Sequence, residues 1–257
     1  MTIKVSVLMT VFNAENFLKY SVNSIIRQSF SDWELVIVDD CSQDNSLNII
    51  KSFKNKKIKI YELKKHFGRT KALNYGLDKC KGKYVAILDA DDISKKNRLK
   101  KQFEFLEKNK SFKMVSSWFT WFHINKNLKI LGTPIINDSI FRKHLIQNII
   151  AHSTVMFLKT FALKLGNYPN KLKYSQDYGL ILKFFKFSKI KILPICLTDC
   201  IIHSNSMTFS KKYKKIVIED FIENLNYIRK NFNLNILEKA IIFWRSTKSK
   251  LNLLLIK

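Results

Sequence analysis

Residues 5–40 read VSVLMTVFNAENFLKYSVNSIIRQSFSDWELVIVDD, and this stretch decides the fold class. It opens with a short apolar run at 5–9, rich in β-branched residues, and a second such run follows at 35–38. Between them, the apolar residues of 16–28 recur near the spacing of one helical face. A buried strand, a helix and another buried strand predict a βαβ unit, in which the two strands are parallel.

The same alternation continues through the first half of the chain. We expect strands at 58–61 and 84–88, helices at 69–80 and 96–109, and one more helix capped by Ser42. Strands separated by helical segments are typical of α/β proteins. The sequence therefore predicts a mainly parallel sheet flanked by helices.

Polar clusters follow three of these strands. Thr10–Asn13, Asp39–Asp40 and Asp89–Asp92 each lie where a predicted strand ends. The carboxyl ends of parallel strands meet at one edge of the sheet, and ligands bind along that edge in open α/β folds. The three clusters therefore predict one site rather than three unrelated surface patches.

The acidic cluster is Asp89-Ala90-Asp91-Asp92, in a chain whose net charge is +26. Carboxylates this close repel one another unless a cation neutralises them, and oxygen ligands suit Mg²⁺ or Mn²⁺. Magnesium-type ions use one or two carboxylates together with substrate phosphates, which indicates a metal that bridges the protein to a nucleotide diphosphate. The alternative interpretation is a helix cap, and we assign that role to Asp92.

Several classes of protein are disfavoured by absent motifs. The six glycines form no G-x-G-x-x-G and no G-x-x-x-x-G-K-[ST], which argues against dinucleotide-binding dehydrogenases and P-loop NTPases. The four cysteines form no C-x-x-C pair, so we expect free thiols and no zinc site. The N-terminus has no signal-peptide pattern and no apolar run reaches the length of a bilayer, so we expect a cytoplasmic protein.

The excess of positive charge has three candidate explanations. Forty of the 46 basic residues are lysine, and the abundance of Lys, Asn, Ile and Phe fits an A/T-rich genome. An anionic membrane surface is the second explanation. Nucleic acid is the weakest, because dedicated readers of bases and phosphates rely on arginine; we expect no nucleic-acid partner.

The second half is less regular. The aromatic-rich segment 115–123, a turn at 125–127 and the run 128–131 indicate antiparallel strands. Asp138 is a candidate cap for a helix that reaches about Ile150. Beyond it we expect a strand at 153–157, a helix at 176–187, short strands at 190–202 and a long helix at 214–231.

Residues 5–46, HFGRTKALNYGL (66–77) and GKYVAILDADD (82–92) together resemble the N-terminal half of family-2 glycosyltransferases of GT-A fold. The resemblance is close over about 3–110 and weaker to about 208. It implies a GT-A domain over 1–210, with a nucleotide-sugar-binding half (1–110) and an acceptor-binding half (111–210), followed by a C-terminal helical extension (211–257).

The resemblance implies roles for residues of the first half. Thr10 and Phe12 would line the nucleobase pocket, with Asp40 accepting a hydrogen bond from the base and Asp39 beside it. Most relatives have Tyr where Phe12 stands. Arg69 lies where relatives contact the base and the diphosphate. Without the resemblance, Asp40 could equally cap a helix and Arg69 could be solvated.

The same resemblance covers the acidic cluster and the later site residues. Asp89-Ala90-Asp91 matches the D-x-D motif, with Asp91 as the direct metal ligand. Asp177 falls where relatives place the general base, and Gln176 replaces the usual Glu. The alternative role for Asp177 is that of an acidic residue at a helix N-terminus, where the helix dipole favours negative charge. His152 would face the acceptor. His203 aligns with a His that can complete the metal shell or touch the phosphates, while a purely structural role for it stays open.

These expectations describe an inverting, metal-dependent glycosyltransferase of hexosyltransferase type. It would use Mn²⁺ or Mg²⁺ and transfer a sugar from a nucleotide diphosphate donor, expected to be UDP-linked, to a hydroxyl of a glycan or lipid-linked acceptor in cell-surface polysaccharide synthesis. The alternatives are a sugar-phosphate nucleotidyltransferase, which should carry a Gly-rich loop that 10–16 lacks, and a non-catalytic basic module that binds membrane or nucleic acid.

The C-terminal segment 236–255 mixes apolar and basic residues in the pattern of an amphipathic helix. Such a helix can lie on the inner face of an anionic cell membrane as a peripheral contact, or it can cover the protein's own domain. The sequence leaves both options open.

Overall fold

The structure is a computed structural model that describes residues 3–123, 128–132, 140–203 and 213–255. The first half contains β1 (Val5–Val11), α1 (Glu15–Ile26), β2 (Trp33–Asp39), α2 (Ser46–Ser52), β3 (Ile58–Glu62), α3 (Arg69–Lys79), β4 (Tyr84–Ile87), β5 (Ile93–Ser94) and α4 (Arg98–Lys108). The second half contains β6 (Phe112–His123), β7 (Leu128–Leu131), α5 (Ile140–Ile146), the 3₁₀ turn η2 (His152–Thr154), β8 (Met156–Leu158), α6 (Lys159–Lys164), α7 (Gln176–Phe187), β9 (Lys189–Ile202), α8 (Lys214–Asn231) and α9 (Ile236–Leu254).

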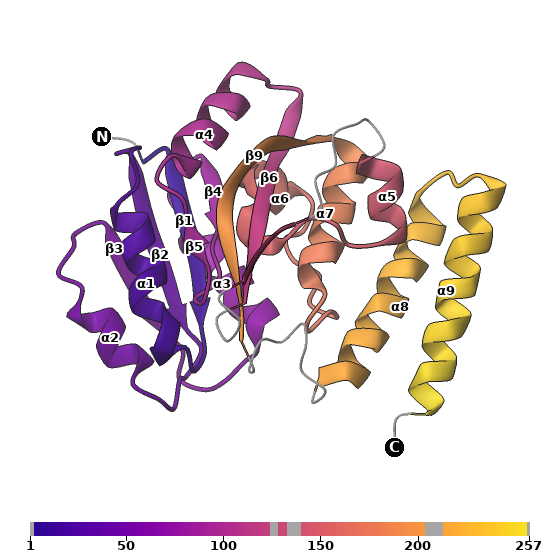
Figure 1. Ribbon diagram of the computed structural model, residues 1–257, viewed down its shortest axis with the longest axis horizontal. Helices are drawn as coiled ribbons and strands as arrows, with labels where there is room; N and C mark the ends of the chain where they lie inside the picture. The colour runs from indigo at the N-terminus through magenta and orange to yellow at the C-terminus, as the bar shows by residue number, and fades with distance from the viewer. Residues whose placement is uncertain (1–2, 124–127, 133–139, 204–212, 256–257) are drawn as a thin grey trace.

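The strands of the described residues form one sheet in the order β3-β2-β1-β4-β8-β6-β9-β5, with β7 paired to β6 (Figure 1). β3, β2, β1 and β4 are parallel neighbours. β8 is antiparallel to both β4 and β6, and β9 is parallel to β6. The sheet is therefore mainly parallel, as the sequence predicts, with β8 inserted between its two halves.

The two faces of the sheet are covered by different helices. Side chains alternate along β1, so that Leu8 packs with α3, α6 and α7 while Val7 and Met9 pack with α1 and α4. Gly76 lets α3 approach the sheet, because a Cβ at this position would lie 2.3 Å from Cδ1 of Leu8 and 2.9 Å from Cγ2 of Val38. This close packing holds α3, whose first residue is Arg69, against the sheet.

Several local predictions are wrong. The strand expected at 153–157 begins only at Met156, because residues 152–154 form the 3₁₀ turn η2. Residues 190–202 belong to one 14-residue strand, β9, rather than to several short ones, and β9 pairs along the length of β6 with a register shift near Trp118. Ser42 does not cap α2, which begins at Ser46; its hydroxyl donates to Asp39 at 2.6 Å instead. The predicted β6–β7 hairpin is antiparallel as expected. The turn at 125–127 and the cap at Asp138 lie outside the described residues.

A third apolar cluster joins α5, α7, α8 and α9. It contains Tyr178 and Leu182 from α7, Leu225 and Ile228 from α8, and Ile242 from α9. α8 and α9 lie side by side at one end of the molecule, beyond α7 (Figure 1). Asn235 and Glu238 form a capping box at the start of α9, and the buried Glu238 also pairs with Arg142 of α5 at 2.7 Å.

Candidate active site

The carboxyl ends of β1, β2 and β4 meet at one edge of the sheet. The backbone N–H of Asp40 donates to Val11 at 2.8 Å, and that of Leu88 donates to Leu8 at 3.1 Å. β1 lies between β2 and β4, so these two bonds bring the segments after β2 and β4 together around its end. The predicted convergence of the three polar clusters is confirmed.

The acidic loop after β4 is fastened by three separate segments. The N–H of Asp89 donates to the Ser153 hydroxyl at 2.9 Å, and the Ser21 hydroxyl donates to the carbonyl of Ala90 at 2.7 Å. Asp92 accepts the N–H of Ile201 in β9 at 2.9 Å. Asp92 therefore ties the loop to β9. Because α4 begins only at Arg98, the assignment of Asp92 as a helix cap is wrong.

The carboxylates of this loop could hold a cation. Within the described part of the chain, Asp89, Asp91 and Asp92 each offer an oxygen that lies within 4.8 Å of the others. The imidazole Nε2 of His203 lies 3.1 Å from Oδ2 of Asp91. Burial, and then the negative charges of Asp91 and Asp89, raise the pKa of Asp92 well above its usual range. Such repulsion is what a divalent cation with oxygen ligands would relieve, so the residues fit a metal.

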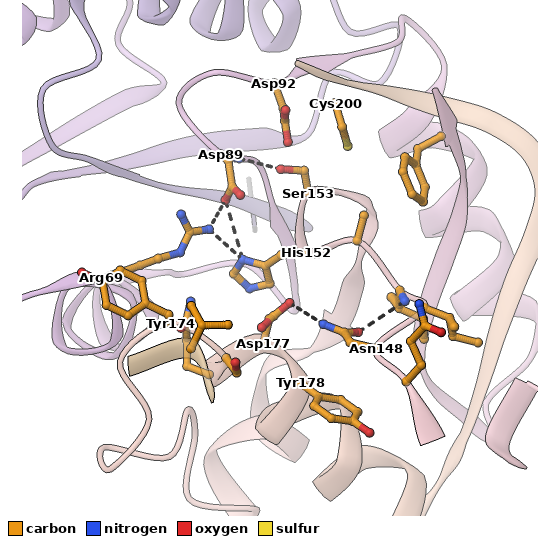
Figure 2. Close-up of a pocket in the computed structure, with 18 of the residues that line it drawn as sticks. Arg69, Asp89, Asp92, Asn148, His152, Ser153, Tyr174, Asp177, Tyr178 and Cys200 are labelled. Atoms are coloured by element: carbon orange, nitrogen blue, oxygen red, sulfur yellow. Dashed lines mark hydrogen bonds and ion pairs between the residues drawn. The ribbon is translucent and has the colours of Figure 1, made fainter. Parts of the chain in front are cut away.

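Arg69 joins this loop to His152. Its Nη2 donates to Asp89 and lies 3.1 Å from Nδ1 of His152 (Figure 2). Nε2 of His152 lies 2.9 Å from the Tyr168 hydroxyl. Burial would raise the pKa of Asp89, but Arg69 and His152 outweigh it and hold that pKa well below its usual range.

Asp177 lies in the first turn of α7 and faces the same space as His152 (Figure 2). Its Oδ2 accepts from the Asn148 side chain at 2.9 Å. The neighbouring Gln176 is buried, and its amide satisfies its hydrogen bonds when its oxygen accepts from Nε of Arg69 at 3.0 Å. A neutral Gln can therefore occupy the position where relatives have Glu.

Asp220 of α8 holds the loop that precedes α7. Its Oδ2 accepts the backbone N–H groups of Lys173, Tyr174 and Ser175 at 2.8, 2.6 and 2.9 Å. Asp220 is only 4% exposed. Asn224, one helical turn later, adds a bond to the carbonyl of Ser175 at 3.3 Å. The N-terminal end of α7, and Asp177 with it, is thus positioned from the C-terminal helices.

A cavity of about 700 Å³ collects many of these groups. Its lining includes Arg69, Asp89, Asp91, His152 and Asp177 from the predicted set. It also includes residues that sequence reasoning missed, namely Asn148, Tyr174, Phe221 and Arg245. Tyr174 belongs to the segment that carries Gln176 and Asp177, and the other three come from segments without a motif, so only the folded chain brings the four together.

The remaining predicted residues lie beside this cavity rather than in its lining. Thr10 and Phe12 are at the end of β1, and Phe12 stacks on His66 with ring centroids 4.0 Å apart. The carboxylate of Asp40 accepts the N–H groups of Phe67 and Gly68, both at 2.8 Å. These bonds connect the end of β2 to the start of α3, one residue before Arg69.

Asp39 and His203 complete the predicted set. Both oxygens of Asp39 accept from Ser42, through its hydroxyl and its N–H. The ring of His203 stacks on Phe17 of α1 with centroids 4.3 Å apart, while its Nε2 points to Asp91. His203 is thus held between helix α1 and the acidic loop.

Comparison with known proteins agrees with this geometry. The sequence profile of glycosyl transferase family 2 matches residues 6–164. One relative is the UDP-Glc:alpha-D-GlcNAc-diphosphoundecaprenol beta-1,3-glucosyltransferase WfgD of Escherichia coli. It is 29% identical over 239 residues, which is 87% of this chain and 92% of the relative.

Solved structures show the same fold. S. aureus TarS 1–349, in complex with UDP-GlcNAc, matches with a TM-score of 0.74 at 20% identity, over 93% of this chain and 70% of that one. The mannosyltransferase PcManGT from Pyrobaculum calidifontis, in complex with GDP-Man and Mn²⁺, gives a TM-score of 0.69 at 15% identity, over 96% of this chain and 73% of that one. The fold is the expected GT-A-like one, and the profile match covers more than half of the sequence, so the chain belongs to glycosyl transferase family 2.

Proposed function

We propose that the protein is an inverting, metal-dependent hexosyltransferase that moves a sugar from a UDP-linked donor to a hydroxyl of a lipid-linked glycan during polysaccharide synthesis. The observation that carries the proposal is one cavity lined by both an acidic cluster and a separate carboxylate, Asp177. The donor and acceptor classes are supported by the name of the E. coli relative. The proposal divides the chain into a transferase domain (1–210, with donor half 1–110 and acceptor half 111–210) and an extension (211–257).

The donor would lie along the carboxyl edge of β1, β2 and β4. Thr10, Phe12, Asp39 and Asp40 would contact the nucleoside, since they lie together at the ends of β1 and β2. The donor diphosphate would reach the cavity, where Arg69, held by Asp89, offers N–H donors to phosphate oxygens.

Mn²⁺ or Mg²⁺ would be held by Asp91, with His203 and the free oxygens of the neighbouring aspartates nearby. Support for a metal comes from this ligand set and from the Mn²⁺ of the archaeal structural neighbour. A bound divalent cation supplies positive charge where the leaving diphosphate gains negative charge.

Asp177 is proposed as the general base. The acceptor hydroxyl oxygen attacks the anomeric carbon, its proton passes to Oδ1 of Asp177, and the bond to the diphosphate oxygen breaks as the new glycosidic bond forms. Asn148 holds Oδ2 and so orients the carboxylate. A single displacement of this kind inverts the anomeric carbon and forms no covalent enzyme intermediate. His152, fixed by Arg69 and Tyr168, would border the acceptor.

We also propose that α9 rests on an anionic bilayer at the inner face of the cell membrane. Its buried residues face the protein, and at about 100° per residue its exposed apolar side chains fall within about a third of its circumference. These are Ile236, Leu237, Phe243, Trp244, Leu251 and Leu254. The exposed Lys239, Lys248 and Lys250 border the apolar stripe, as interfacial helices require.

Among the described helices, none is long and apolar enough to cross a membrane.

Flotation with phosphatidylglycerol vesicles tests this contact. Truncation at 235 would remove Ile242 from the core, so point changes are preferable. Trp244→Ser with Leu251→Ser should abolish flotation, whereas Phe187→Ser, at an exposed aromatic of α7, should leave it intact. Equal flotation of all three chains would refute the contact.

The transferase proposal is tested by nucleotide release across a panel of UDP- and GDP-sugars with Mn²⁺, Mg²⁺ or EDTA. We expect UDP release that needs metal and acceptor, and a fall of roughly a thousandfold in Asp91→Asn. Asp32→Asn, which removes an exposed carboxylate paired with Lys4, is the matched control. Transfer in EDTA at the full rate, or none from any donor, would overturn the proposal.

A further inference from the structure

Arg245 of α9 lines the cavity from the side of the C-terminal helices. Its guanidinium lies over the ring of Phe221 of α8, 5.3 Å from the centroid. Val217 and Ile218 of α8 line the same wall. In the described ranges, no carboxylate lies within ion-pair distance of Arg245. Among the described residues, the wall formed by α8 and α9, here the α8–α9 wall, therefore presents a cation that has no ion-pair partner and lies beside apolar side chains.

The two arginines of the cavity have different partners. Arg69 is already engaged by Asp89, and it belongs to the end of the cavity that carries Asp91 and Asp92. Arg245 belongs to the wall built from helices at the other end of the fold from β1–β3 (Figure 1). A cation that is stacked on an aromatic ring keeps its in-plane N–H groups available, and these match the oxygens of a phosphate.

A phosphate that binds Arg245 could belong to the donor or to the acceptor. The geometry of an inverting displacement decides between these two substrates. The attacking hydroxyl must approach the anomeric carbon from the side opposite the leaving diphosphate. If the donor diphosphate lies at the acidic end, the acceptor must enter from the far side of the transferred sugar. The α8–α9 wall is then on the acceptor's side, and its cation meets an anion of the acceptor.

We propose that the α8–α9 wall is a subsite for an acceptor whose sugar is joined to a lipid through phosphate, with Arg245 binding the phosphate oxygens. Val217, Ile218 and Phe221 supply apolar surface for the first part of the lipid chain. This inference rests on the proposed transferase function. It adds that the enzyme selects its acceptor by the phosphate link as well as by the sugar.

The test compares two acceptors that share one sugar. One is N-acetylglucosamine joined through diphosphate to an undecyl chain, and the other is undecyl N-acetylglucosaminide without phosphate. The wild-type chain should favour the first in kcat/KM. Arg245→Gln should reduce that preference about tenfold, and Arg245→Lys should restore part of it, because Lys keeps the charge but not the paired N–H groups. Arg229→Gln is the matched control: Arg229 stacks on Phe243 outside the cavity lining, and its loss should leave the preference unchanged.

A binding experiment separates this inference from the transferase proposal. Undecyl diphosphate, inorganic diphosphate and UDP are titrated separately, with binding followed by tryptophan fluorescence. Arg245→Gln should weaken undecyl diphosphate about tenfold and leave UDP within twofold, and inorganic diphosphate should bind more weakly than its undecyl ester. An unchanged acceptor preference, or equal weakening of UDP, overturns the subsite. Failure of the wild-type chain to transfer sugar, with the undecyl diphosphate result intact, overturns the transferase proposal alone.

Discussion

The two sides of the cavity are built in different ways. On the sheet side, Asp89 and Asp91 follow β4 directly, and the neighbouring parallel strand β1 fixes where that strand ends. On the helical side, Asp177 stands at the start of α7, whose preceding loop is held by Asp220, 45 to 47 positions further along the chain. The first side is positioned by backbone pairing, and the second by side chains of distant helices. Substitutions on the sheet side should therefore act on the donor and its metal, and those on the helical side on acceptor binding and turnover.

Asp177→Asn is the sharpest test of this division. An amide cannot take the acceptor proton, so kcat should fall by roughly a thousandfold while the Kd for UDP and metal changes less than threefold. Steady-state transfer assays measure kcat, and calorimetric titration with UDP and metal measures the Kd. Asp32→Asn serves as the surface control. A variant that lost UDP affinity in proportion to kcat would show that Asp177 belongs to the donor side.

Asp220→Asn should have the next largest effect. The amide keeps one acceptor oxygen but loses the negative charge that holds three N–H groups, so the free energy of unfolding should fall by about 2 kcal/mol. The loop before α7 then relaxes, and kcat should fall roughly tenfold with the KM for UDP-sugar retained. Denaturant unfolding and steady-state kinetics check both. A drop in stability with unchanged kcat in the folded fraction would mean that Asp220 supports the fold but does not position Asp177.

The same division explains what could be predicted from the sequence. Three parallel strands of the first half, β1, β2 and β4, are short apolar runs followed by Asp or Asn, and this local pattern predicts both the sheet and the convergence of Asp40 with Asp89. The residues that build the helical side, such as Asn148, Asp220 and Arg245, have no neighbours in sequence that mark them. The single long strand β9 could not be predicted for a related reason. Its pairing with the distant β6, rather than its own sequence pattern, makes it one continuous strand. The role of Asp92 could not be predicted either, because its partner, Ile201, lies 109 positions away along the chain.

Acid should loosen the helical side first. His144 of α5 is fully buried among α7 residues, and burial lowers its pKa to about 3 from an ordinary value of 6.5. Between these pH values the unfolded chain binds a proton that the folded chain refuses, so stability is lost as pH falls below 6.5. The loss should reach about 2 kcal/mol at pH 5.

Denaturant unfolding at pH 7.5 and 5 measures this loss. His144→Gln should remove about that amount from the pH dependence, since Gln does not titrate. His123→Gln is the control, because His123 lies on β6 and His144 on α5. If both variants kept the full wild-type dependence, the acid sensitivity would have to come from other groups.

Phe12 provides the mildest test, on the sheet side. Its ring is 43% exposed and stacks on His66, which contacts Asp40 at 2.9 Å. If the nucleobase joins this stack, Phe12→Ala should raise the Kd for UDP about fivefold, in line with about 1 kcal/mol for an aromatic contact, and leave kcat nearly unchanged. Phe187→Ala removes an aromatic of similar exposure from α7 and should not alter the Kd. A fall in kcat without a change in the Kd for UDP would contradict the division, because a residue at the end of β1 would then govern turnover.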